Sequence, residues 1–158
     1  MFLHLPALMH MTMSSCRDLE APNSSISLHL LPKNQTIMLV EDQSDIRWLL
    51  KRRLEINGYT CLEAANGREA LSLIQQHPSI SLILSDYLMP EMNGLQLLQA
   101  LRQNPMKRKI PFILVMASWS DQLQHQGMSA GAFAILAKPY HHGELVQLLE
   151  QGISTQAA

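Results

Sequence analysis

Four charged residues of this sequence could do chemistry together if the fold brings them to one place: Glu41, Asp42, Asp86 and Lys138. Three converging carboxylates would repel one another, and a hard divalent cation such as Mg²⁺, which prefers oxygen ligands, would relieve that repulsion. A cation and a lysine are also what a transferring phosphoryl group needs, because its equatorial oxygens carry dispersed negative charge. A carboxylate held beside them can act as the nucleophile. Acidic residues are also common in solvated loops, so spacing alone leaves that second interpretation open.

These residues stand after short apolar segments of the kind that form strands buried on both faces. The five expected strands are residues 36–40, 59–63, 80–84, 112–116 and 133–137. Apolar residues at helical spacing follow each strand. Ser44 is a candidate N-cap, Gly58 suits the end of a helix, and Asn66 with Glu69 resembles a capping pair. The later helices are expected at 94–102, 121–128 and 144–151.

The alternation of five strands with five helices predicts an α/β fold. Such a pattern implies right-handed crossovers and a parallel sheet covered by helices on both faces. In open sheets of this kind, ligands bind outside the carboxyl ends of the strands, near the point where the strand order reverses. The four charged residues are expected at that edge.

The composition suits one domain that does not bind nucleic acid directly. The chain has 158 residues, 16% of them charged, and a formal net charge of −1, without the basic balance typical of nucleic-acid binding. Cys16 and Cys61 form no metal-ligand pattern, and Cys61 has apolar neighbours. We therefore expect a buried thiol at Cys61 and a reduced, cytoplasmic protein. No run reaches the roughly 18 apolar residues of a membrane span.

The N-terminal part of the chain differs from the rest. Residues 1–34 show no sustained helical period or alternation, and we expect a disordered extension there, with a domain at 35–153 and a short tail at 154–158. A signal peptide is a weaker alternative, because no basic residue precedes the apolar stretch and His4 and Pro6 interrupt it.

Three local motifs strengthen the prediction of phosphoryl chemistry. The segment 40–47 resembles the acidic-pair opening of receiver domains of two-component response regulators, and 85–94 keeps their phosphoacceptor pattern D-x-x-M-P-x-M-x-G. Residues 131–132 and 137–140 resemble the ending G-A…K-P-[FY] of the same family. The resemblance covers residues 36–153. It implies a flavodoxin-like, doubly wound (βα)5 sandwich with a five-stranded parallel sheet.

The resemblance assigns a role to each matching residue. It implies that Asp86 is the phosphoacceptor and that Asp42, Asp86 and the backbone carbonyl of Leu88 bind Mg²⁺ directly. Glu41 would act through bound water. Lys138 would pair first with the Asp86 carboxylate and then with the phosphoryl oxygens.

The resemblance also implies how the domain works with other proteins. The phosphoryl group would come from a sensor histidine kinase or a histidine phosphotransfer protein, and the signal would pass to a downstream protein target. The domain would not be an enzyme beyond its own Mg²⁺-dependent phosphorylation. Few residues follow the last expected helix, so we expect a single-domain type. A cis peptide bond is implied between Lys138 and Pro139.

Two positions depart from the family pattern. Met116 stands at the end of the fourth expected strand, where the family carries Thr or Ser, and Ile135 stands in the fifth, where it carries Tyr or Phe. The hydroxyl and the ring normally report phosphorylation to the surface, so an atypical switch is expected. Ser118 or Ser120 is a weaker candidate for a substitute hydroxyl. A receiver-like interaction module that does not depend on phosphate is the main alternative function.

Two other classes fit the sequence less well. A flavin-binding electron carrier would need a phosphate-cradling loop where Glu41 and Asp42 stand. A phosphatase of the haloacid-dehalogenase type would need a second aspartate in place of Leu88. The pair His141–His142 is expected at a solvated helix start rather than a metal site, and Trp48 on the exposed side of the first helix.

Overall fold

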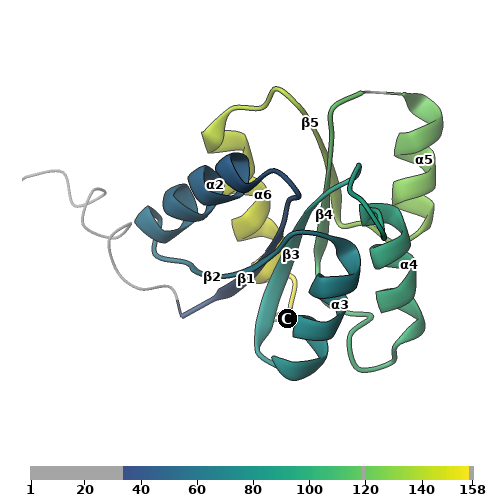
Figure 1. Cartoon of the computed structure of the whole chain (residues 1–158), viewed down its shortest axis with the longest axis horizontal. Helices are drawn as coiled ribbons and strands as arrows, with labels where there is room; N and C mark the ends of the chain where they lie inside the picture. Colours follow the sequence, from purple (N-terminus) through teal and green to yellow (C-terminus); the bar gives the residue numbers. More distant parts are fainter. Residues whose placement is uncertain (1–33, 119, 157–158) are drawn as a thin grey trace, which may run out of the picture.

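The computed structural model describes residues 34–118 and 120–156, which form a five-stranded parallel sheet with helices between the strands (Figure 1). The elements are β1 Thr36–Val40, α2 Ser44–Ile56, β2 Thr60–Ala64, α3 Gly67–Gln76, β3 Ile80–Asp86, α4 Gly94–Gln103, β4 Phe112–Met116, α5 Asp121–Ser129, β5 Ala134–Ala137 and α6 His142–Ser154. The strand order is β2-β1-β3-β4-β5. The predicted α/β fold is confirmed. Residues 1–33 of the expected extension and 157–158 of the expected tail lie outside the described residues.

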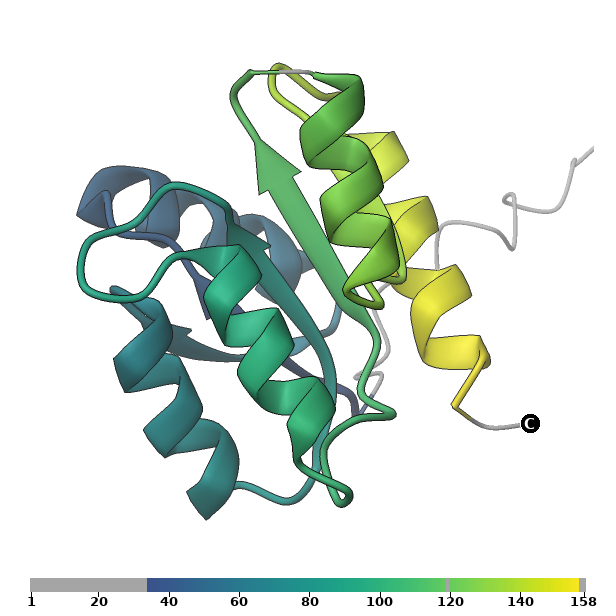
Figure 2. The same ribbon diagram turned by 90° about the vertical axis from the view of Figure 1, so that its right-hand side faces the viewer.

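Helices cover both faces of the sheet. The side chains of α2 and α6 pack on one face, and those of α3, α4 and α5 pack on the other, which faces the viewer in Figure 2. Strand β3 lies in the middle, and each of its residues is buried. This burial explains why the strand reads as a nearly continuous apolar run. Within the described residues, no helix is long and apolar enough to cross a membrane.

Local sequence signals explain several of the helix ends. The Asn66 side chain accepts a hydrogen bond from the backbone N–H of Glu69, and Asn93 with Gln96 forms a reciprocal capping box at the start of α4. Gly58 follows the end of α2 with φ of +85°, a conformation that glycine adopts without steric cost. The caps at Asn66 and Asn93 fix the helix starts that follow the carboxyl ends of β2 and β3.

Several predicted boundaries were wrong by one or more residues. Ser44 is the first residue of α2 rather than its cap, and the N-cap Gln43 makes no side-chain cap hydrogen bond. Strand β3 continues to Asp86, because Ser85 pairs with Val40 of β1 and Asp86 with Val115 of β4. Backbone pairing on both sides therefore extends the strand into polar residues that the apolar pattern leaves out.

Candidate functional site

The carboxyl ends of two neighbouring strands, β1 and β3, bring the acidic residues together. Glu41 and Asp42 directly follow β1, Asp86 is the last residue of β3, and these strands are neighbours in the sheet. One ligand oxygen from each of the three residues lies within 4.8 Å of the others. Glu41 is only 2% exposed and Asp86 8%, whereas Asp42 is exposed.

Lys138 reaches this cluster from the end of β5. Its Nζ donates to Oδ2 of Asp86 at 2.8 Å and to Oε2 of Glu41 at 3.1 Å. The Lys138–Pro139 peptide bond is cis, as the resemblance implied. The four residues named from the sequence thus lie together at one edge of the sheet.

The electrostatics of the cluster suit a cation. Burial raises the pKa of Glu41 above its ordinary value, although the hydrogen bond and the charge of Lys138 act in the opposite direction. Burial alone would lower the pKa of Lys138, but its hydrogen bonds and charge interactions with Asp86 and Glu41 outweigh this, so the pKa is raised. The lysine therefore stays charged at neutral pH. Three carboxylates against one ammonium leave surplus negative charge, and an all-oxygen donor set of this kind fits Mg²⁺.

The backbone around Asp86 is held tightly. Its Oδ1 accepts a hydrogen bond from the N–H of Tyr87 at 2.7 Å, and the Ser85 hydroxyl donates to the Asp86 carbonyl at 2.9 Å. Gly94 packs directly against that carbonyl, and a Cβ atom at position 94 would also lie 2.7 Å from Cδ1 of Leu114. The glycine that ends the phosphoacceptor motif is therefore required by this close approach.

The loop between β3 and α4 carries Leu88, which is 63% exposed. The loop docks on the start of α3 through a hydrogen bond from the Gly67 N–H to the Met92 carbonyl at 3.0 Å. Glu91 within the loop has φ of +63°. The hydrogen bond between Gly67 and Met92 holds the loop that follows Asp86 against α3.

Both departures from the family pattern lie on the face covered by α3, α4 and α5. Met116 is the last residue of β4, is 1% exposed and packs in the core on that face. Its carbonyl accepts a hydrogen bond from the Lys138 N–H at 2.8 Å. Ile135 of β5 pairs with Leu114 and is partly buried against the same core. Neither side chain can donate a hydrogen bond to a phosphoryl oxygen.

Arg47 is a residue of this region to which sequence reasoning gave no role. It lies on α2, and its Nη1 donates to the carbonyl oxygens of Glu41 at 2.6 Å and Asp42 at 3.4 Å. The sequence feature that could have pointed to Arg47 was its position at the end of the acidic-pair motif, residues 40–47. The carbonyl contacts depend on how the loop turns, and residue types alone do not reveal that.

The other residues singled out from the sequence lie elsewhere. Trp48 is 63% exposed on α2, as expected. The prediction of a solvated histidine pair was wrong for His142, which is partly buried with Nε2 3.0 Å from Nδ2 of Asn57. Cys61 is partly buried against the core, and burial raises the pKa of its thiol to about 12. Its sulfur is therefore protonated and unreactive at neutral pH.

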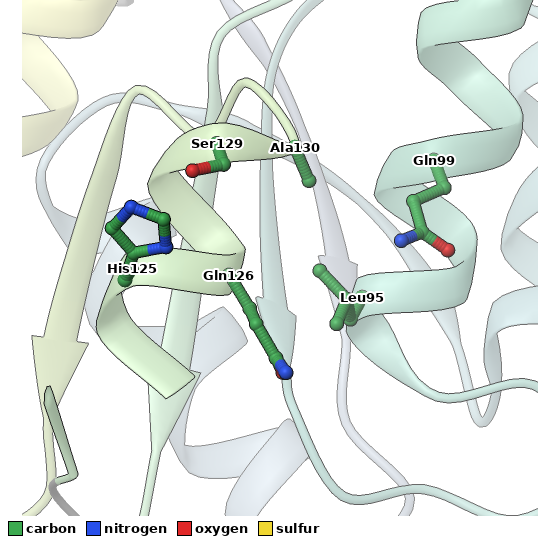
Figure 3. A pocket seen from close by; sticks show the side chains of 6 residues that line it. All are labelled: Leu95, Gln99, His125, Gln126, Ser129 and Ala130. Carbon is green, nitrogen blue, oxygen red and sulfur yellow. The ribbon is translucent and has the colours of Figure 1, made fainter. Parts of the chain in front are cut away.

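A separate groove of about 470 Å³ lies between α4 and α5 (Figure 3). It is lined by Leu95, Gln99, His125, Gln126, Ser129 and Ala130. The lining holds no carboxylate, so this groove could not serve as the cation site.

A family model described as "Response regulator receiver domain" matches residues 37–150. The chain therefore belongs to the receiver domains of two-component response regulators. These domains generally act as switch modules that bind Mg²⁺ at an acidic pocket.

Named relatives agree with this class. The chain is 34% identical over 116 residues to the phosphate regulon transcriptional regulatory protein PhoB of Pseudomonas aeruginosa, covering 73% of the chain and 50% of the relative. It is 38% identical over 110 residues to the transcriptional regulatory protein CpxR of Escherichia coli, covering 70% and 45%. The chain thus spans about half the length of these relatives.

Solved structures show the same fold. The chemotaxis protein CheY4 of Vibrio cholerae superimposes with a TM-score of 0.70 at 29% identity, covering 75% of this chain and 98% of that one. The receiver domain of a signal transduction histidine kinase from Syntrophus aciditrophicus gives a TM-score of 0.71 at 32% identity, covering 77% and 91%.

Proposed function

We propose that Asp86 accepts a phosphoryl group in a Mg²⁺-dependent reaction and that residues 35–153 are the receiver domain that carries this signal. The observation that supports the proposal best is the contact between Lys138 and Asp86, 2.8 Å from Nζ to Oδ2, inside a cluster of carboxylates. A charged lysine at this distance can hold a phosphoryl oxygen once the Asp86 carboxylate has reacted.

The reaction is a displacement at phosphorus. An oxygen of Asp86 forms a bond to the phosphorus atom while the P–N bond of a phosphohistidine breaks, and the imidazole leaves with the electron pair. Asp42, Asp86 and the Leu88 carbonyl would hold Mg²⁺, with Glu41 acting through a bound water. When bound, the ion neutralises charge on the transferring group. Lys138 supplies a fixed positive charge in contact with Oδ2 of Asp86.

The donor we propose is a sensor histidine kinase or a histidine phosphotransfer protein, and the recipient of the signal is a downstream protein. The net charge of −1 favours protein contacts over direct binding of nucleic acid by this domain. We place the domain in the cytoplasm, where the donor's phosphohistidine would be available. PhoB and CpxR are named as transcriptional regulatory proteins, but the chain covers only half of each.

Intact-mass measurement after incubation with a small phosphodonor tests the proposal. The wild-type chain should gain one HPO₃ group with Mg²⁺ and none with EDTA. Asp86→Asn should gain none, whereas Asp45→Asn, which removes an exposed carboxylate outside the cluster, should behave like the wild type. A gain that survives Asp86→Asn would contradict the proposal.

A second candidate function is an interaction module that works without phosphate. Met116 favours it, because a buried thioether replaces the hydroxyl that would contact the phosphoryl group. A wild-type chain that gains no mass from any donor, yet binds a partner, would support this alternative.

A further inference from the structure

Arg47 connects the loop that bears two of the carboxylates to the neighbouring helix and strand. From α2, its guanidinium donates to the carbonyl oxygens of Glu41 at 2.6 Å and Asp42 at 3.4 Å. On the other side, its Nε lies 3.7 Å from Oε2 of Glu63 on β2. The side chain is only 19% exposed, so these contacts are partly shielded from water.

The two carboxylates differ in what fixes their orientation. The Glu41 carboxylate accepts hydrogen bonds from Lys138 at 3.1 Å and from the Gln43 N–H at 3.2 Å. Within residues 34–118 and 120–156, no hydrogen bond or ion pair reaches the carboxylate of Asp42, which is exposed. The direction of the Asp42 side chain therefore depends on the backbone that carries it. Arg47 holds that backbone at the Asp42 carbonyl.

We infer that Arg47 is a positioning residue that orients the Glu41–Asp42 pair toward a divalent cation through the two backbone carbonyls. The inference rests on the proposed Mg²⁺ site. Residues that orient metal ligands without touching the metal commonly change its affinity about 10- to 100-fold when they are replaced.

The sign of the effect separates positioning from simple charge. Arg47 is itself a cation near the cluster, so its removal should strengthen Mg²⁺ binding if charge alone mattered. Loss of the carbonyl contacts frees the loop, and ordering it again on binding weakens Mg²⁺ affinity. A positioning role therefore predicts the opposite direction from a charge effect.

Substitution of Glu63 offers a second test of how the Arg47 guanidinium is held. It accepts a hydrogen bond from Lys51 at 2.5 Å and steadies the guanidinium of Arg47 from the side away from the loop. The variant Glu63→Gln removes the charge that steadies Arg47 but leaves both carbonyl contacts possible. We expect it to weaken Mg²⁺ binding less than loss of the guanidinium does.

The experiment is calorimetric titration of the full chain with MgCl₂ for the wild type, Arg47→Met, Arg47→Lys and Arg52→Met. Arg52 lies on the same helix in an exposed pair with Glu55, so its variant removes one positive charge without touching the loop. Arg47→Met should raise the dissociation constant for Mg²⁺ on the order of tenfold. Arg47→Lys keeps the charge but not the fork of donors and should also weaken binding. Arg52→Met should leave the affinity unchanged or slightly tighter.

Thermal melting without Mg²⁺ separates positioning from folding. If Arg47 only holds α2 to the sheet, Arg47→Met lowers the melting temperature and leaves the dissociation constant of the folded protein unchanged, which overturns the inference. Tighter Mg²⁺ binding by Arg47→Met overturns it as well. Should Arg47→Met fail to fold, Arg47→Lys provides the comparison, because it keeps the charge and loses the fork of donors.

The outcome is distinguishable from failure of the proposed function. A wild type that binds Mg²⁺ but gains no phosphoryl group contradicts the proposed function, while weaker binding by Arg47→Met still supports the positioning role. A wild type that binds no Mg²⁺ overturns both.

Discussion

Gly127 of α5 lies against Ile135 of β5 so closely that a Cβ atom at position 127 would come within 2.8 Å of the isoleucine Cδ1. The same Cβ would lie 3.3 Å from Cδ2 of Leu114, the residue that pairs with Ile135 in the sheet. Gly127 is the only buried residue of α5 among those described. The close packing of α5 on the sheet therefore depends on a glycine at position 127 that faces an aliphatic side chain.

A double-mutant cycle tests this contact between Gly127 and Ile135. Alanine is favoured over glycine within a helix by about 1 kcal/mol, but in the wild type the new Cβ meets the Ile135 methyl group. Ile135→Val removes that methyl group. We therefore expect the effect of Gly127→Ala on the free energy of unfolding to be more favourable in the Ile135→Val background than in the wild type. The coupling between the two substitutions should be at least about 0.5 kcal/mol. Urea unfolding of the four proteins measures it, and additive effects would contradict the predicted contact.

Ile135 is also one of the two positions that depart from the family pattern for signalling phosphorylation, and Met116 is the other. In the family pattern, a hydroxyl at the end of the fourth strand contacts the phosphoryl group and an aromatic ring on the fifth turns inward. Met116 is buried and cannot donate that hydrogen bond, which is worth about 1.5–3 kcal/mol to a charged acceptor. Ile135 has no ring, and its β-branch restricts χ1. We expect phosphorylation, or a fluoroberyllate mimic, to change α5 and β5 only slightly.

Backbone amide chemical shifts with and without the mimic measure this coupling. The double variant Met116→Thr with Ile135→Tyr should enlarge the shifts in α5 and β5, because it supplies a contact that differs between the two states. Large shifts across both elements in the unmutated protein would contradict the prediction. They would direct attention to Ser118 as a substitute hydroxyl.

Gly94→Ala should be strongly destabilising. Its Cβ would collide with the Asp86 carbonyl, and a backbone atom cannot move aside as easily as the end of a side chain. We expect a loss of about 1–3 kcal/mol in the free energy of unfolding. Gly143→Ala is the matched control, because no atom lies within 4 Å of a Cβ there and α6 should gain slightly from alanine. Equal effects of the two substitutions in chemical denaturation would refute the requirement for glycine.

Asp42→Asn should change stability and metal response in opposite directions. Without Mg²⁺ it removes one of three mutually repelling carboxylates, and we expect a gain of up to about 1 kcal/mol because Asp42 is exposed. Millimolar Mg²⁺ should raise the melting temperature of the wild type by mass action and have little effect on the variant. An unchanged Mg²⁺ response in Asp42→Asn would exclude this residue as a ligand.

The sequence predicted the layers of the fold and the location of the site for physical reasons. The apolar runs mark strands buried on both faces, and the carboxyl ends of parallel strands share one edge, where Asp86 and Lys138 were expected. The contact between Lys138 and Asp86 was implied by the resemblance to receiver domains, and the structure places Nζ 2.8 Å from Oδ2. The boundaries were harder, because the pairing that carries β3 to Asp86 depends on neighbours in the sheet. Some contacts depend on the path of a loop, and the sequence carries no periodic pattern that could predict them. The contacts of Arg47 and the Asn57–His142 pair are examples.

The identity of the phosphorylated residue is the most direct test of the central claim, because Asp42 is an exposed carboxylate in the same cluster and is the natural rival of Asp86. An acyl phosphate on aspartate can be reduced with borohydride to homoserine and then located by peptide sequencing in the mass spectrometer. The account predicts homoserine at position 86 alone, formed only when Mg²⁺ was present during phosphorylation. Homoserine at position 42, or at position 86 in equal yield with EDTA, would contradict it.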